Sequence, residues 1–369
     1  MKFQVDRAGL TQVLQRVQSI TDKKSSMPIL GNTLIKASRD QTVEFSGTDL
    51  ELSLWTGMAA QVAEEGSTTV SAKKLHEIVR ELPQDLVSIE SLPNNRLVIR
   101  AGRSRFELAS TPAEDFPNIN FYQDLPLVAC EGEVLRRSLN KTLYSIPVEE
   151  DSFTIAGLYW HPLENGGFRF VSTDGHRLAY FEPPREAFSG LQIEKGLILP
   201  RKGVQEILKI LEKETEASIG MDEKSIVLRS PSTFLSVQLL DAEFPEYEMI
   251  IPPERPSGFS VERETFLPAL KRVSVLTDNV YRHVRFNIAK GLLELECGNP
   301  ELGSANDSID VDYEGEDFSI AFNIRYVLEG VQAIDGERIR FEWIDQFHGG
   351  IFFGEEDPGY LSLIMPMVV

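Results

Sequence analysis

Three side chains capable of acid–base chemistry stand close together in the segment Thr173-Asp174-Gly175-His176-Arg177-Leu178. A carboxylate, an imidazole and a guanidinium in one turn could hold a substrate while the imidazole moves a proton. The same segment also suits a plain turn, because Asp-Gly is a favourable turn pair. An enzyme site acting through Asp174, His176 and Arg177 and a structural turn are therefore both open at this point.

No other motif in the sequence supports catalysis. The spacing of the five histidines, at positions 76, 161, 176, 283 and 348, fits no metal site. There is no Gly-x-Ser-x-Gly motif, no Walker loop and no paired-carboxylate motif. We therefore predict no catalytic residue, no metal site and no cofactor.

Length and composition narrow the class of protein. The 369 residues are enough for two to three domains. No apolar run approaches 18 residues and the first residues alternate like a strand, so we expect neither a membrane span nor a secretory signal. Cys130 and Cys297 are too few for a disulfide framework, which favours the cytoplasm. The net charge of −20 by itself argues against nucleic acid.

Three kinds of landmark recur along the chain at intervals of 123–131 residues. Repeats of this kind must be recognised before any motif is interpreted. Amphipathic helices are predicted in windows 7–20, 131–146 and 261–276, and later helices at 75–82, 204–211 and 327–331. Hairpins close each repeat near residues 96–109, 225–239 and 350–364. The fold class is therefore α+β, with domains at 1–125, 126–255 and 256–369.

Charge is segregated by secondary structure. In six helical windows (7–20, 71–82, 131–146, 200–213, 261–276 and 321–334) Lys and Arg outnumber Asp and Glu by 16 to 9, whereas the rest of the chain has 21 basic and 48 acidic residues. Lysines on solvated helix faces are one explanation. The other is that all the helices share a surface that meets a polyanion, with acidic strands outside it.

Several stretches in these repeats resemble the family of the bacterial DNA polymerase III beta subunit, the sliding clamps. They are Thr173–Ala179, Phe244-Pro245, Pro200–Gly203 and Met365-Pro366-Met367, and the resemblance covers the whole chain. It implies three repeated DNA-clamp domains, each with two helices lining a channel and antiparallel sheets outside, in a ring-shaped head-to-tail dimer. It also implies a non-catalytic processivity factor that encircles double-stranded DNA without sequence specificity. Its implied partners are the replicative polymerase subunit, the clamp loader and other proteins with clamp-binding motifs.

The resemblance further implies a hydrophobic pocket for short peptides of these partners. An apolar chain end and methionines suit such a pocket, because methionine adapts to varied ligands. The end Val368-Val369 differs from the basic residue and Leu that are common in the family. The implied pocket residues are Ile155, Thr173, Gly175, His176, Arg177, Leu178, Pro245, Met249, Ile250, Tyr281, Asn323, Tyr326, Phe347, Leu363, Ile364, Met365, Pro366 and Met367.

Basic residues of the helices are assigned to DNA, together with Lys24 in the loop after the first helix. A second loop that contacts DNA in the family corresponds to Glu149–Thr154, which is acidic here. The candidates from the helices are Lys73, Lys74, Arg80, Arg136, Arg137, Lys141, Arg201, Lys202, Lys209, Lys271 and Arg272.

The dimer interface is expected to join an edge strand of one subunit to a segment of the other, because paired edges satisfy their open hydrogen bonds. Phe106 could alternatively belong to the core. The expected interface residues are Arg103, Arg105, Phe106, Val275, Leu276, Glu301 and Asp307.

Two alternatives to a clamp remain. One is an enzyme, and the other is a repeat scaffold that does not bind DNA and whose acidic residues serve solubility. Only the clamp requires a dimer of twice 41.5 kDa, so size-exclusion chromatography separates them.

Overall fold

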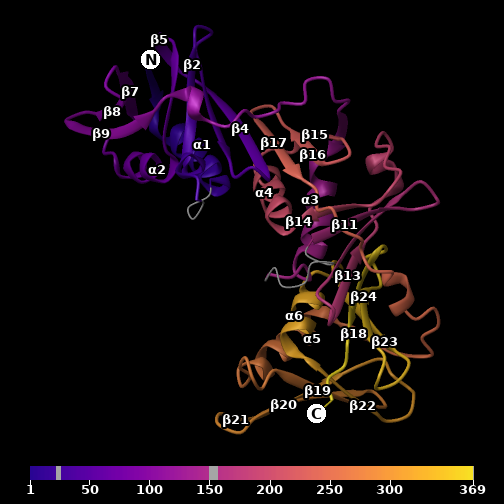
Figure 1. Cartoon of the computed structure of the whole chain (residues 1–369). Coiled ribbons are helices and arrows are strands. Elements are labelled where there is room, and N and C mark those ends of the chain that lie inside the picture. Colours follow the sequence, from indigo (N-terminus) through magenta and orange to yellow (C-terminus); the bar gives the residue numbers. More distant parts are fainter. Residues whose placement is uncertain (22–25, 149–156, 369) are drawn as a thin grey trace. The chain divides into compact units, whose positions relative to one another are not determined.

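The computed structural model describes residues 1–21, 26–148 and 157–368. Within these residues the chain forms six α-helices, each lying in a window where the sequence predicts one (Figure 1). The six helices are α1 (Arg7–Ile20), α2 (Ala72–Glu81), α3 (Gly132–Leu143), α4 (Arg201–Leu211), α5 (Arg263–Ser274) and α6 (Ile324–Gln332).

The chain divides into two compact units, of which the first comprises Met1–Gly132 and Gln205–Leu239. Its strands form one 13-stranded sheet, and α1 packs on α2 and on the strands β3 and β4. In spatial order the strands are β10 (Val128–Glu131), β15 (Glu216–Met221), β16 (Ser225–Arg229), β17 (Thr233–Gln238), β4 (Leu52–Ala59), β3 (Thr42–Thr48), β2 (Asn32–Ser38), β6 (Gly66–Ser71), β9 (Ser104–Thr111), β8 (Arg96–Ala101), β7 (Leu86–Leu92), β1 (Lys2–Asp6) and β5 (Gln61–Glu64).

The second unit comprises Glu133–Val204 and Leu240–Val369, and in it α5 packs against α6. Its eight-stranded sheet runs β14 (Leu197–Pro200), β11 (Gly157–Pro162), β12 (Phe168–Thr173), β13 (Arg177–Phe181), β25 (Tyr360–Ile364), β24 (Gly350–Gly354), β23 (Arg338–Trp343) and β18 (Ser257–Glu262). Its four-stranded sheet runs β21 (Gly303–Asp310), β20 (Leu292–Asn299), β19 (His283–Ala289) and β22 (Phe318–Asn323).

The helices begin and bury their faces as their sequences predict. The carboxylate of Asp6 accepts a hydrogen bond of 2.7 Å from the Gly9 amide at the start of α1, and the Asn323 side chain does the same for Arg325 at the start of α6. Such caps satisfy amides that have no partner within the helix. In α5, Phe266, Ala269, Leu270 and Val273 are buried, at the spacing of one helical face.

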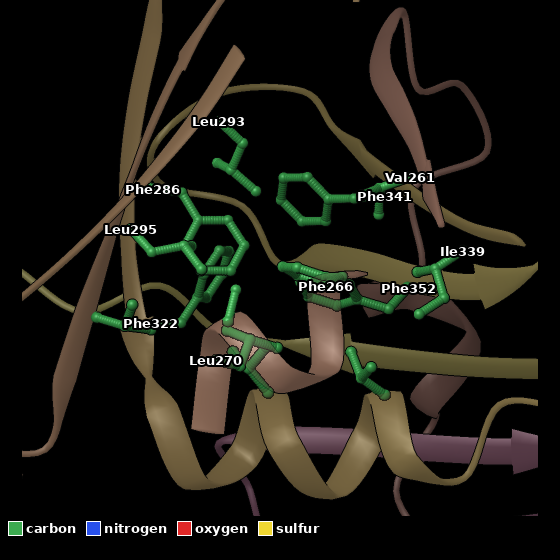
Figure 2. Close-up of a cluster of buried hydrophobic side chains, with 14 of the residues drawn as sticks. Val261, Phe266, Leu270, Phe286, Leu293, Leu295, Phe322, Ile339, Phe341 and Phe352 are labelled. Carbon is green, nitrogen blue, oxygen red and sulfur yellow. The ribbon is translucent and has the colours of Figure 1, made fainter. Parts of the chain in front are cut away.

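One core cluster of the second unit is rich in phenylalanine. Figure 2 shows Phe266 and Leu270 of α5 directed toward Phe286, Phe341 and other rings from the neighbouring strands. The rings of Phe341 and Phe352 are stacked, with centroids 4.5 Å apart and planes inclined by 29°. A buried phenylalanine of this kind contributes about 2–3 kcal/mol through removal of its apolar surface from water, so this cluster fixes the helices against the sheets.

The three hairpins predicted from the sequence are confirmed, as the antiparallel pairs β8–β9, β16–β17 and β24–β25. Two other pairings link the repeats: β4 pairs with β17 in the first unit, and β13 pairs with β25 in the second. The central repeat therefore contributes strands to both units, and the domain boundaries at 125 and 255 stay a prediction. In the described ranges, no helix is long and apolar enough to cross a membrane.

Candidate functional site

The Asp-Gly segment between β12 and β13 forms a tight turn. The Asp174 carboxylate accepts hydrogen bonds of 3.1 Å from the amides of His176 and Arg177, and the Thr173 hydroxyl donates to the Arg177 carbonyl at 2.6 Å. Gly175 has a φ of +83°, which favours glycine. The turn that the sequence left open as one alternative is therefore present, and it aligns β13 for pairing.

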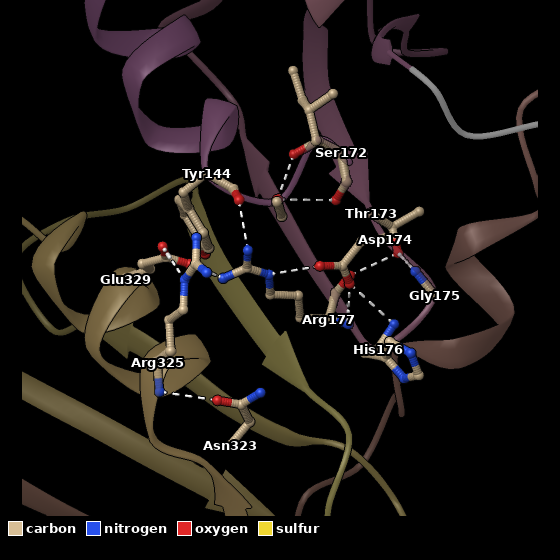
Figure 3. Close-up of polar contacts among 12 residues, drawn as sticks. Tyr144, Ser172, Thr173, Asp174, Gly175, His176, Arg177, Asn323, Arg325 and Glu329 are labelled. Carbon is tan, nitrogen blue, oxygen red and sulfur yellow. Dashed lines mark hydrogen bonds and ion pairs between the residues drawn. The ribbon is translucent and has the colours of Figure 1, made fainter. Parts of the chain in front are cut away.

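The guanidinium of Arg177 is enclosed by partners on three sides (Figure 3). Its Nε donates to Asp174 at 3.0 Å, its Nη1 donates to Glu329 of α6, and its Nη2 donates to the Tyr144 carbonyl at 2.6 Å. It also lies 4.2 Å from the ring centroid of Tyr326. Burial lowers the pKa of Arg177, but the hydrogen bond and charge of Glu329 and the charge of Asp174 outweigh burial and raise it. Arg177 is thus a permanent cation held inside the protein.

These contacts argue against the enzyme alternative. Asp174 is committed to the turn and to Arg177, and Arg177 is only 6% exposed. His176 is exposed, and its main-chain amide and carbonyl bond to Asp174 and Met365. General acid–base catalysis needs such groups within reach of one another and of a substrate. In the described part of the chain, no group of three or more His, Cys, Asp or Glu side chains could hold a metal ion.

The apolar C-terminal segment is fixed beside this turn. Leu363 and Ile364 of β25 pair with Leu178 and Arg177 of β13. Beyond β25, the Met365 amide donates to the His176 carbonyl at 2.9 Å, and the Met367 amide donates to the Ala321 carbonyl at 2.7 Å. The segment after Ile364 therefore does not continue β25. We call residues 365–368 the strip, which is hydrogen-bonded to the turn after β12 and to β22.

Four large apolar side chains are exposed on this strip or next to residues that pack on β13 and β25. Met249 and Ile250, in the 3₁₀ turn η4 (Tyr247–Ile250), are 80% and 50% exposed, Phe347 is 70% exposed, and Met365 is 39% exposed. Tyr247 packs in one cluster with the buried Leu178 and Leu363, while Gly349, near Phe347, also touches Leu363. Exposed apolar groups gathered in this way mark a surface that binds a partner.

The other residues assigned to the pocket have mixed positions. Pro245 is exposed and Pro366 and Met367 are half-buried, whereas Thr173, Leu178, Leu363 and Ile364 are buried in strands. Asn323 is buried and caps α6, while Tyr281 and Tyr326 are half-buried. Ile155 lies outside the described residues.

A cleft of about 430 Å³ adjoins the Arg177 network. It brings together Tyr326, from the predicted pocket, and Arg201, from the predicted DNA residues. Arg201 donates through Nη1 to the carbonyl of Leu143 at 3.0 Å and to that of Ile146, near the end of α3. Glu329, Tyr144 and Arg325 also line the cleft. These three residues were not predicted, because no local sequence pattern identifies residues that tertiary contacts bring together.

Most of the basic residues assigned to DNA are exposed, and many of them have an acidic neighbour on the same helix. Lys74 lies 2.8 Å from Glu77, Arg136 lies 2.7 Å from Glu133, and Lys209 lies 2.6 Å from Glu206. Such pairs hold the cations only weakly, because water screens them. Lys73, Lys74, Arg80, Lys209, Lys271 and Arg272 are exposed, and Arg136, Arg201 and Lys202 are half-buried.

The assignment of Lys141 to DNA is wrong. Lys141 is 3% exposed, and its Nζ lies 2.5 Å from the Asp357 carboxylate, 3.0 Å from Asp335 and 2.7 Å from the Ala333 carbonyl. Arg137, one turn earlier, is exposed but pairs with the same two carboxylates at 2.8 and 2.9 Å. An ammonium group buried in this way cannot reach a phosphate. Lys24 and the loop 149–154 lie outside the described residues.

Two strands that the dimer prediction uses have unpaired edges within the described structure. β9 pairs with β8 along residues 104–109 and meets β6 only at Ser110 and Thr111. β21 is the terminal strand of the four-stranded sheet. Phe106 on β9 is 40% exposed, so the alternative that places it in the core is wrong. Val275 is 75% exposed and Leu276 is half-buried.

Comparison with known proteins agrees with this arrangement. The chain matches the family models of the DNA polymerase III beta subunit, with its N-terminal domain at residues 1–120, its central domain at 129–246 and its C-terminal domain at 248–368. It is 34% identical to the beta sliding clamp of Caulobacter vibrioides and 31% identical to that of Vibrio cholerae, over 100% of each chain.

Solved structures give the same result for the fold. The sliding clamp of Bartonella birtlesii bound to griselimycin is 30% identical, with a TM-score of 0.93 and coverage of 100% of both chains. The Caulobacter crescentus clamp with polyethylene glycol bound to a putative beta-motif tethering region is 33% identical, with a TM-score of 0.92 and coverage of 100% of this chain and 99% of that chain.

Three successive clamp domains, each with two helices and antiparallel sheets, define a DNA clamp. The chain belongs to the family of the DNA polymerase III beta subunit, the bacterial beta sliding clamps. Its function is therefore that of a sliding clamp, the non-catalytic processivity subunit of a DNA polymerase, as the sequence predicted.

Proposed function

We propose that two copies of this chain join head to tail into a closed ring around duplex DNA. The observation that carries this proposal is that, within the described residues, β21 and residues 104–109 of β9 each leave one edge unpaired. An exposed edge invites pairing with another chain unless it is protected. When β9 of each copy meets β21 of the other, two copies close into a ring and both of these edges are paired.

The charges on the two edges favour this pairing over pairing of like edges. Arg103 and Arg105 are exposed at β9, whereas Glu301 is exposed just before β21 and Asp310 at its end. Asp307, also assigned to the interface, is half-buried and pairs with Arg272 at 2.7 Å. Edges of opposite charge attract, and like edges repel.

The DNA contacts in this proposal come from exposed and half-buried cations of the helices. They are Lys73, Lys74, Arg80, Arg136, Arg137, Arg201, Lys202, Lys209, Lys271 and Arg272, with Lys24 assigned from the sequence. Lys141 is excluded because it is buried. Contacts to phosphates alone carry no sequence information, which suits a protein that moves along DNA.

The exposed Met249, Ile250, Phe347 and Met365 form the proposed pocket, to which the polymerase subunit, the clamp loader and other partners bind by short peptides. A few apolar anchors supply most of the binding energy in contacts of this size. Because the polymerase acts on the chromosome, we assign the protein to the cytoplasm, and we retain the domains 1–125, 126–255 and 256–369.

Loading onto DNA tests the ring. Protein loaded onto closed circular DNA should survive a high-salt wash, because topology and not ion pairing holds it there, and it should be released when the circle is cut once. Binding to short linear duplex at physiological salt should be weak, because few cations contact phosphates and little counterion release then drives binding. Protein that stays bound after the cut, or that binds short linear duplex tightly, would refute the ring.

A further inference from the structure

The turn η4, which carries Met249 and Ile250, has little regular structure to hold it. It lies in the stretch between β17 and β18, and within the described residues it has no side-chain cap. Tyr247, the first residue of η4, is 4% exposed and enters the cluster of Leu178 and Leu363. The orientation of the two exposed side chains therefore depends on how Tyr247 and its neighbour Glu248 are anchored.

Arg169 of β12 makes that anchor. Its Nη1 donates to the Tyr247 hydroxyl at 2.9 Å and to Glu248 at 3.1 Å. Its Nε donates to Glu182, just after β13, at 2.7 Å, which fixes the guanidinium from the other side. It also lies 4.6 Å from the ring centroid of Tyr180. Arginine suits this position because its planar guanidinium can donate hydrogen bonds and stack on an aromatic ring at the same time.

The Tyr247 hydroxyl completes a chain of hydrogen bonds. Burial raises the pKa of Tyr247 to about 12, so the hydroxyl keeps its proton. It accepts from Arg169 and lies 2.7 Å from His161 Nδ1, to which it donates its proton when that nitrogen is unprotonated. Burial, with the charge of Arg169, lowers the pKa of His161, which favours the neutral ring. The Tyr247 hydroxyl thus has a hydrogen-bond partner on each side.

We propose that Arg169 is a positioning residue for the peptide pocket, acting through Tyr247 and Glu248 on the wall formed by Met249 and Ile250. This proposal rests on the proposed function, since it takes that wall as part of the pocket. Arg169 does not touch the peptide, and its side chain is only 18% exposed. Its removal leaves the strip at Met365 and the side chain of Phe347 in place.

The test measures binding of a fluorescein-labelled peptide from the clamp-binding segment of the replicative polymerase by fluorescence anisotropy. Arg169→Met should weaken binding at least tenfold, and Tyr247→Phe, which keeps the ring but loses the hydroxyl, about three- to fivefold. Arg185→Met is the matched control, because Arg185 is exposed in the same unit and its side chain makes no hydrogen bond or ion pair with the other described residues. It should bind like wild type.

A double-mutant cycle distinguishes positioning from general stabilisation. With Met249→Ala and Ile250→Ala already present, Arg169→Met should cost less than twofold more, because the wall that it positions is gone. With Phe347→Ala present, it should cost the full tenfold. Equal costs in both backgrounds, or normal binding by Arg169→Met, would overturn the proposal. If Arg169→Met fails to fold, Tyr247→Phe decides in the same cycle. Wild type that binds no peptide would instead overturn the proposed pocket.

Discussion

Basic residues on the same helix of this chain differ in burial. Arg136, Arg137 and Lys141 look equivalent in the sequence, yet only Lys141 is buried. Its partners, Asp335 and Asp357, lie about two hundred residues further along the chain. No local pattern could reveal these tertiary contacts. The sequence therefore shows that a basic residue lies on a helix, but not whether its side chain faces water. Tyr144 and Glu329, the half-buried partners of Arg177 from other elements, were missed for the same reason.

Removing Lys141 should destabilise the protein without changing its retention on DNA. Lys141→Met leaves Asp357, which is 1% exposed, with Arg137 as its one cationic partner among the described residues. Breaking a buried pair on one side typically costs about 3 kcal/mol or more, because the remaining charge is left in a low dielectric. Urea unfolding measures the loss. Lys271→Met, which removes an exposed cation, should change stability by less than about 0.5 kcal/mol, and an equal effect of the two changes would contradict this account.

Asp335 should make the protein sensitive to acid. Burial raises its pKa, but the hydrogen bond and charge of Lys141 and the charge of Arg137 outweigh burial, so the pKa lies below its ordinary value. The folded protein therefore binds fewer protons than the unfolded chain, whose Asp has a pKa of about 3.9. The stabilisation is present above that pH and is lost as pH falls through the folded pKa. Thermal unfolding between pH 6 and pH 3 should show a smaller decline for Asp335→Asn than for wild type. Parallel curves would show that Asp335 contributes nothing.

At the scale of elements, the sequence was most informative where the signal is local. The spacing of Leu10, Leu14 and Val17 predicts α1, and turn residues such as Asp357-Pro358-Gly359 predict the last hairpin. The pairings β4–β17 and β13–β25 were not predicted. Backbone hydrogen bonds between strands so far apart leave no trace in either strand's own residues. The candidate pocket was therefore assembled from the family resemblance, and its composition stays a prediction.

Deleting Met365–Val369 should weaken peptide binding more than tenfold while leaving the dimer intact. The strip is held by backbone bonds from Met365 to His176 and from Met367 to Ala321, so its removal takes away one pocket side without disturbing β25. Fluorescence anisotropy with the polymerase peptide measures binding, and sedimentation measures the dimer. Unchanged affinity would show that the strip is not part of the pocket.

At the scale of the whole molecule, the proposed ring depends on surfaces that a single chain leaves open. Asp and Glu outnumber Lys and Arg by 57 to 37 in the whole sequence, while the six helical windows are net positive. That distribution suits a protein that DNA meets only along its helices, because acidic surfaces elsewhere repel it. The sequence could show this segregation by counting alone, whereas the open edges of β9 and β21 became visible only once the strands were paired.

The ring should open when one of these edges receives a charge that it cannot pair. Phe106 is 40% exposed on β9, and in the proposed dimer a partner edge covers it. Phe106→Asp buries a carboxylate among apolar groups, at a cost of about 3 kcal/mol or more, equivalent to at least a hundredfold weaker association. Sedimentation should then show monomers at concentrations where wild type is dimeric, with unchanged circular dichroism. Leu86→Asp is the control, because Leu86 is 52% exposed on β7, which pairs on both sides. If Phe106→Asp remains dimeric, β9 is not the interface.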